Sequence, residues 1–156
     1  MHGQANYRGY AAGNLSRTPA WLWGKLFDSG QGYPLLRIPK HHCYRLGSTD
    51  YLNDAQQCHQ FQQQSFEIPR QQEEWFPVWG ELLVFDDPLQ RIPRLDDFED
   101  YEPQKPSLYD RVLSSVIAMD PHGKPHAHMA WVYVQGSAAP KHFLDKVIAK
   151  WPVQKI

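Results

Sequence analysis

The sequence predicts an α+β domain in which β-strands dominate the middle of the chain. Runs rich in aromatic and aliphatic residues, each bounded by turn-forming residues, predict the strands. The four longest runs are 21–27, 75–85, 108–119 and 127–134. A different spacing, with apolar residues three and four positions apart, predicts helices at 89–100 and 140–151. With 156 residues, 42% of them hydrophobic, the chain is expected to form one domain with its own core.

The N-terminal part combines a loop with two strands. The first twenty residues have no periodic apolar pattern, which predicts a loop. The strand at 21–27 ends at the turn signal Asp28-Ser29-Gly30, and a short strand at 35–38 ends before Pro39.

Residues 40–74 form a polar, glutamine-rich insertion. Its glutamines are at positions 56, 57, 60, 62, 63, 64, 71 and 72. A polar helix is predicted over 51–66, starting near Ser48 or Asp50, with few residues that could hold it in place. The insertion is too short and too polar for a core of its own, so it forms either a surface segment or a lid over a site.

The helix at 89–100 has a recognisable start. Asp87 is placed to act as the N-cap, and Pro88 suits the first helical position because its missing N–H has no partner there. Pro93 predicts an interruption or bend.

The last elements are a hairpin and a helix. Strand 108–119 places alternate residues on one face, and Asp120-Pro121-His122-Gly123 predicts the turn into strand 127–134. The helix at 140–151 is amphipathic. Its core-facing residues would be Phe143, Leu144, Val147, Ile148 and Trp151.

Composition argues against several functional classes. A formal net charge of −1 and a pI near 6.7 give no electrostatic reason to expect nucleic acid or an anionic membrane as a partner. No apolar run has the length of a membrane span. Two cysteines are too few for a disulfide framework, which predicts a reducing, cytoplasmic location.

A metal site is not predicted. His41, His42, Cys43, Cys58 and His59 carry suitable zinc ligands. However, they contain no Cys-x2-Cys pair, and adjacent histidines do not easily point the same way. A glycine-rich phosphate loop is also missing, so nucleotide binding has no support.

An acidic turn lies between the strands at 75–85 and 108–119. Leu95 and Phe98 are three residues apart and share one face of a helical turn, while Asp96 and Glu99 share a neighbouring face. A carboxylate fixed beside a sheet is a candidate general base. In a single sequence, though, the commoner interpretation of a glutamate is a solvated surface acid.

Several short motifs, in this order, resemble the γ-glutamylcyclotransferase-like (AIG2-like) family. The central ones are Gly80-Glu81-Leu82, Leu95-Asp96-x-x-Glu99, Tyr101, Tyr109-x-Arg111 and Ala130-Trp131-x-Tyr133. Upstream, Gly24-Lys25-Leu26-Phe27-Asp28, Gly32-Tyr33-Pro34 and Gly3-Gln4-Ala5-Asn6-Tyr7 are similar to further segments of that family. The resemblance covers most of the chain apart from the insertion and the final helix.

The resemblance implies a small mixed β-barrel with flanking helices, and an enzyme. Active members of the family convert a γ-glutamyl amine or amino acid to 5-oxoproline and the free amine, without a metal or organic cofactor. The family's catalytic glutamate falls on Glu99, while the Asp96 position is expected to be structural. Candidate substrate-binding residues are Tyr33, Tyr109, Tyr133 and Arg111.

Alternatives remain for these side chains. Tyr109 and Tyr133 could equally be core residues. Arg111 could pair with a carboxylate of the protein rather than of the substrate.

One family segment is expected but missing. A strand followed by Tyr-Gly-Ser/Thr-Leu should lie just before Gly3, so the first strand and its substrate-binding loop are predicted to be absent from this chain. Either the reading frame starts further upstream, or the protein is a truncated, non-catalytic binding or interaction module on the same fold.

Overall fold

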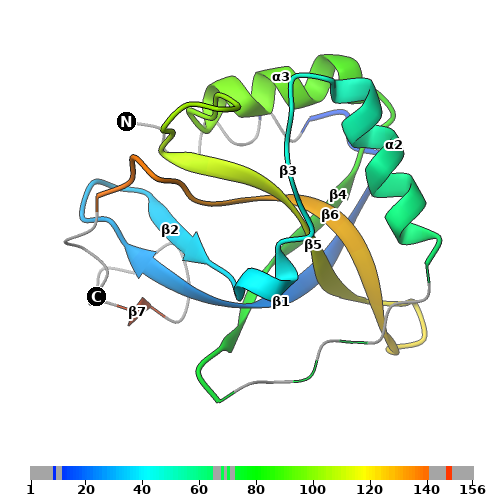
Figure 1. Cartoon of the computed structure of the whole chain (residues 1–156). Helices are drawn as coiled ribbons and strands as arrows, with labels where there is room; N and C mark the ends of the chain where they lie inside the picture. Colours follow the sequence, from blue (N-terminus) through cyan, green and yellow to red (C-terminus); the bar gives the residue numbers. More distant parts are fainter. Residues whose placement is uncertain are drawn as a thin grey trace.

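An antiparallel sheet is the framework of the protein, as seen in a computed structural model that describes residues 9, 12–64, 68, 70, 73–140 and 147–148. Its strands are β1 (Ser16–Asp28), β2 (Pro34–Arg37), β3 (Arg45–Leu46), β4 (Phe76–Val84), β5 (Tyr109–Met119), β6 (Pro125–Gln135) and β7 (Val147–Ile148). The helices are η1 (Lys40–His42), α2 (Tyr51–Gln62) and α3 (Pro88–Phe98). Helices α2 and α3 contact each other at one end of the sheet (Figure 1). The predicted α+β class is confirmed.

Two long hairpin-like ribbons make up most of the sheet. β5 and β6 pair from Tyr109–Gln135 to Met119–Pro125, and β1 pairs with β4 along Ser16–Gly24. The ribbons join where Ala20 and Trp21 of β1 pair with β5. β2 and β7 pair with the end of β1, and β3 pairs with β5. Pairings among the described strands do not close into a ring, so the sheet is open in this part of the chain.

The predicted strands are confirmed, with one difference at the start of β1. We expected loop through residue 20, but β1 begins at Ser16. The extension forms because Ser16 pairs with Val84 at the far end of β4, so β4 supplies hydrogen-bonding partners for residues with little apolar pattern of their own. Tertiary pairing therefore decides this boundary rather than local composition.

The main core cluster combines residues of both ribbons. Leu22 of β1, Val112 and Val116 of β5, and Val134 of β6 pack together with Ile38. β5 is buried on both faces along nearly its whole length. A strand covered on both faces holds its side chains rigidly, and β5 is the strand that carries Tyr109 and Arg111.

The segment predicted as an insertion is held firmly to the sheet. Asp50 caps α2 by accepting a hydrogen bond from the Asn53 N–H at 3.1 Å, as predicted. As expected, few residues hold this helix: Asp54 is the one residue of α2 that is fully buried. The Gln62 side chain also accepts a hydrogen bond from the Met129 N–H of β6 at 2.6 Å. Polar contacts, rather than an apolar stripe, hold α2 in place.

Helix α3 starts as predicted, with Asp87 at the N-cap and Pro88 in the first turn. The Asp87 carboxylate holds Arg91 at 2.9 Å instead of capping an N–H group. The predicted interruption does not occur, since α3 continues through Pro93 to Phe98. None of the helices in the described part of the chain combines the length and the apolar character that crossing a bilayer requires.

The predicted C-terminal helix falls largely outside the described residues. At Val147 and Ile148, which are described, the chain is not helical but forms β7 and pairs with Leu26 and Phe27 of β1. The motif around Gly3 also lies outside the described residues.

Candidate functional site

The C-terminal end of α3 fixes the position of Glu99. Glu99 is the C-cap of the helix, and its N–H donates to the Leu95 carbonyl at 2.9 Å. Asp100 follows with a φ of 54°, so the chain turns sharply in the left-handed region. The Tyr101 N–H then donates back to the Asp96 carbonyl at 2.8 Å. Glu99 therefore projects from a tight, hydrogen-bonded turn.

Burial dominates the electrostatics of the Glu99 carboxyl group. The residue is partly exposed, yet burial raises the pKa of this carboxyl to about 7. Its side chain makes no hydrogen bond or ion pair with the described residues. A carboxyl with a pKa near 7 exchanges protons readily at neutral pH, which is what a general acid/base needs.

Two tyrosines, Tyr109 and Tyr133, respond to the charge of this carboxyl group, and a third, Tyr33, contacts Tyr109. The rings of Tyr33 and Tyr109 contact each other edge to face, with centroids 6.3 Å apart. Burial raises the pKa of Tyr109, and the Glu99 charge raises it further. Burial also raises the pKa of Tyr133, followed by the Asp96 charge and, more weakly, by that of Glu99. Tyr109 and Tyr133, both predicted as site residues, therefore lie close enough to Glu99 for its charge to affect their pKa values.

The tyrosine hydroxyl groups already have protein partners. Tyr109 donates to the Pro34 carbonyl at 2.5 Å, and Tyr133 donates to the Asp96 Oδ1 at 2.6 Å. Tyr33 donates to the Gln31 side chain at 2.6 Å. The rings of Tyr109 and Tyr133 are thus held by hydrogen bonds at their far ends, so they form fixed aromatic walls.

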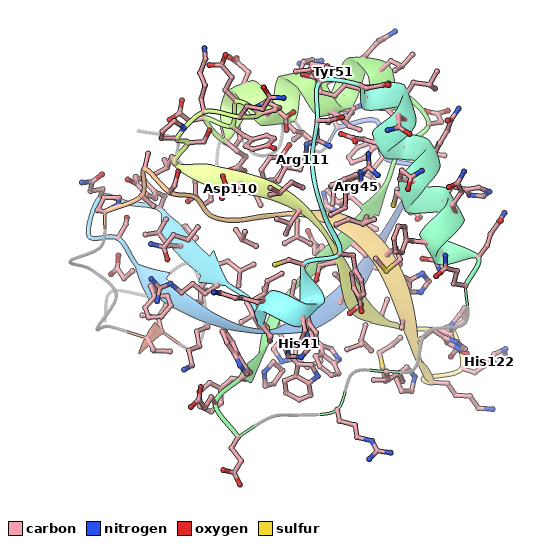
Figure 2. All side chains as sticks on the ribbon, in the orientation of Figure 1. His41, Arg45, Tyr51, Asp110, Arg111 and His122 are labelled. Carbon is pink, nitrogen blue, oxygen red and sulfur yellow. The ribbon has the colours of Figure 1, made fainter. Side chains whose placement is uncertain are left out.

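Arg111 lies next to this group but is enclosed by the protein. Its Nε donates to Asp96 Oδ1 at 2.8 Å, and its Nη2 donates to Asp54 Oδ2 at 2.9 Å. The Arg111 residue has an exposed fraction of 0%. In Figure 2, Arg111 is labelled below the helices and Tyr51 above it at the start of α2, while His122 in the hairpin turn is labelled far away at the lower right. Arg111 therefore joins β5 to both α2 and α3.

The surroundings of the Arg111 guanidinium group are aromatic and very close. The ring of Trp131 lies 4.7 Å from Cζ, and the rings of Tyr51 and Tyr101 lie at 5.7 Å. Their faces attract the cation. A Cβ at Gly47 would lie 2.6 Å from the Arg111 Cζ, so only glycine fits at this position without displacement.

The structure separates the predicted site residues into two groups. In the first group, Tyr109 and Tyr133 respond to the charge of Glu99, and Tyr33 contacts Tyr109. Arg111 was predicted as a substrate-binding residue, but both of its ion pairs are with carboxylates of the protein and its side chain is not exposed. The alternative of a structural ion pair fits this geometry, and we assign Arg111 to the internal network.

Sequence reasoning missed Asp54 and the role of Tyr101. Asp54 lies in a helix that is polar on most sides, so no pattern distinguishes it from the exposed residues around it. Tyr101 was noted only as part of a motif, whereas its hydroxyl donates to the Gly47 carbonyl at 2.7 Å. Nothing in the local sequence links positions 47 and 101.

The described residues contain no group of three or more His, Cys, Asp or Glu side chains that could hold a metal ion. His41 and His42 instead stack edge to face, with ring centroids 4.5 Å apart. The Sγ of Cys58 lies 3.5 Å from the Met129 carbonyl oxygen.

No protein-family model, no curated protein and no solved structure matches the chain.

Proposed function

We propose that the protein is a γ-glutamylcyclotransferase-like enzyme that converts a γ-glutamyl amine or amino acid to 5-oxoproline and releases the amine. The observation that carries the proposal is the Glu99 carboxyl group, which has a pKa of about 7, no side-chain partner among the described residues, and tyrosine rings around it. The ordered motifs that resemble the family support the same position as the catalytic glutamate.

The reaction suits a single carboxylate. The α-amino group of the substrate attacks its own γ-carbonyl carbon, a C–N bond forms, and a five-membered ring closes. The substrate supplies proximity, so the enzyme only has to hold it in the attacking conformation. Glu99 takes a proton from the α-ammonium group, which makes it nucleophilic. Glu99 then donates this proton to the departing nitrogen as the γ-glutamyl C–N bond breaks, and the new ring nitrogen gives its second proton to the released amine, which leaves as an ammonium ion.

The aromatic walls have a defined part in this mechanism. Tyr109 and Tyr133 present rings whose hydroxyls are already bonded, so they keep water from the Glu99 carboxyl without competing for its proton. A less hydrated carboxylate has a higher pKa, which keeps Glu99 able to act as base and then as acid. Tyr33 extends the same wall beside Tyr109.

The proposal includes finer expectations about the fold and the reaction. The open sheet belongs to a small β-barrel, and the enzyme works in the cytoplasm without a metal or organic cofactor. Backbone N–H groups would hold the oxyanion that forms on the γ-carbonyl.

The experiment measures 5-oxoproline and free amine released from a panel of γ-glutamyl amines and γ-glutamyl amino acids. We expect Glu99→Gln to lower turnover by about 10²-fold or more, because the amide cannot carry the proton. Asp97→Asn is the matched control, since Asp97 is an exposed carboxylate two residues away, and it should retain activity. Equal turnover by Glu99→Gln would overturn the proposal. Absence of turnover by the unmodified protein would favour the non-catalytic binding module.

A further inference from the structure

The segment Gly47–Asp54, which belongs to the polar insertion, wraps around the Arg111 side chain. The Gly47 N–H donates to the Arg111 carbonyl at 2.8 Å. Arg111 Nη2 donates to the Ser48 carbonyl at 2.8 Å and to Asp54 Oδ2 at 2.9 Å. These contacts hold both the backbone and the guanidinium group of Arg111.

Asp54 is the polar centre of this segment. It is fully buried, and both carboxylate oxygens are engaged. Besides Arg111, Oδ2 accepts from the Ser48 N–H at 2.7 Å and Oδ1 accepts from the Ser48 hydroxyl at 3.0 Å. A buried carboxylate with this many donors has one fixed geometry, and removing it leaves Arg111 with a single carboxylate partner.

The same network holds the chain on both sides of Glu99. Three residues before it, Asp96 accepts from Arg111 Nε at 2.8 Å. Two residues after it, Tyr101 donates its hydroxyl proton to the Gly47 carbonyl at 2.7 Å. The turn that carries Glu99 is therefore connected at each end to Arg111 or to the segment around it.

We propose that Asp54 is a positioning residue for Glu99, and that the segment Gly47–Asp54 is a working part of the active site rather than a surface insertion. Asp54 touches neither Glu99 nor substrate. It acts through Arg111 and Asp96, which fix the end of α3. This inference rests on the proposed role of Glu99 as acid/base.

The position of Glu99 controls how well its carboxyl group is shielded from water. The titratable groups that respond to its charge are Tyr109 of β5 and Tyr133 of β6. Both lie on strands and should stay in place when the segment loosens. A shift of the α3 end would expose the carboxyl to solvent, and its pKa would fall towards the ordinary value of 4.5.

The test is an NMR titration of the Glu99 side-chain carboxyl carbon in protein labelled with ¹³C-glutamate, with the signal assigned by its loss in Glu99→Gln. In Asp54→Asn we expect the titration midpoint to fall from about 7 towards 4.5. We also expect kcat to fall about tenfold or more with a smaller change in KM, because a misplaced general base slows the chemical step.

A second variant guards against loss of folding in Asp54→Asn. Tyr101→Phe removes only the hydrogen bond to Gly47 and leaves all charges in place, so it should produce a smaller shift in the same direction. Val116→Ala is the control, because Val116 packs in the core on the other face of β5. It should lower the melting temperature without moving the Glu99 midpoint.

The outcomes separate this inference from the proposed function. A wild-type Glu99 midpoint near 4.5 would contradict the acid/base role itself. A wild-type midpoint near 7 that stays unchanged in both Asp54→Asn and Tyr101→Phe, with unchanged kcat, would overturn the positioning role alone. A midpoint that shifts as much in Val116→Ala as in Tyr101→Phe would also overturn it, because the effect would then reflect general destabilisation.

Discussion

Asp96 and Glu99 are two carboxylates one helical turn apart, and their surroundings differ completely. Asp96 accepts hydrogen bonds from Arg111 and Tyr133 through one oxygen and is buried. Burial raises the pKa of Asp96, while these two hydrogen bonds oppose the rise. Burial also raises the pKa of Glu99, and no hydrogen bond from the described residues opposes it.

The difference shows how one short helix end can serve two purposes. A carboxylate that is paired with a buried arginine has a structural role, and it does not act as a general acid or base. A carboxylate that is shielded but unpaired keeps a proton affinity close to neutral pH. Three experiments test this difference between the two carboxylates.

The largest effect is expected from removing the partner of Asp96. Arg111→Met would leave two buried carboxylates, Asp54 and Asp96, without their cation, and should lower the free energy of unfolding by about 3–5 kcal/mol. Urea denaturation measures the change. Arg17→Met is the control, because the Arg17–Glu81 pair is exposed and should contribute under about 1 kcal/mol. Similar losses of unfolding free energy in both variants would show that the buried network stabilises the fold no more than the exposed pair does.

The second effect concerns Glu99 and depends on pH. The pKa of Glu99 is raised in the folded state. Its contribution to the free energy of unfolding is therefore most favourable below about pH 4.5 and is lost as the pH rises through about 7. Glutamine at position 99 does not ionise, so the Glu99→Gln variant does not lose this stability as the pH rises. The variant should match the wild type near pH 4 and be more stable by about 1–3 kcal/mol at pH 8. Urea denaturation at the two pH values measures it.

The control for this experiment is Glu102→Gln. Glu102 is exposed and pairs with Lys105 on the surface, so its removal should give no gain in stability at pH 8. A Glu99→Gln variant that is no more stable than the wild type at pH 8 would mean that the Glu99 carboxyl is well hydrated.

The smallest effect is the difference in stability between variants of Tyr133 and Tyr109, the two tyrosines beside Glu99. Tyr133→Phe removes a hydrogen bond to the Asp96 carboxylate and should cost about 1–2 kcal/mol. Tyr109→Phe removes a bond to a neutral carbonyl group, that of Pro34, and should cost about 1 kcal/mol or less. Thermal unfolding of the two variants compares them. A larger loss in Tyr109→Phe would contradict the assignment of Tyr133 to the Asp96 network.

Much of the fold could be predicted because its signals are local. The runs that form β4, β5 and β6 are apolar or aromatic and end at turn residues, and Asp87-Pro88 marks the start of α3. The position of Glu99 at the end of that helix followed from the same pattern.

The rest could not be predicted because it depends on contacts between distant segments. Ser16 belongs to a strand only because Val84 pairs with it. Asp54 and Arg111 are separated by 57 residues, and a buried aspartate in a polar helix looks like an exposed one. Periodicity reports which face of an element is apolar, but it does not report which polar side chains are enclosed.

The lack of a side chain at Gly47 has a consequence for how the sequence can vary. A methyl group there would overlap the Arg111 guanidinium carbon, whereas a Cβ at Gly80 in β4 would meet nothing within 4 Å. Space therefore permits a side chain at position 80 but not at position 47, and we expect position 47 to stay glycine among natural variants of this chain. If position 47 changes, we expect the partners at positions 54, 96 and 111 to change in the same lineages, because these four sites share one packed volume.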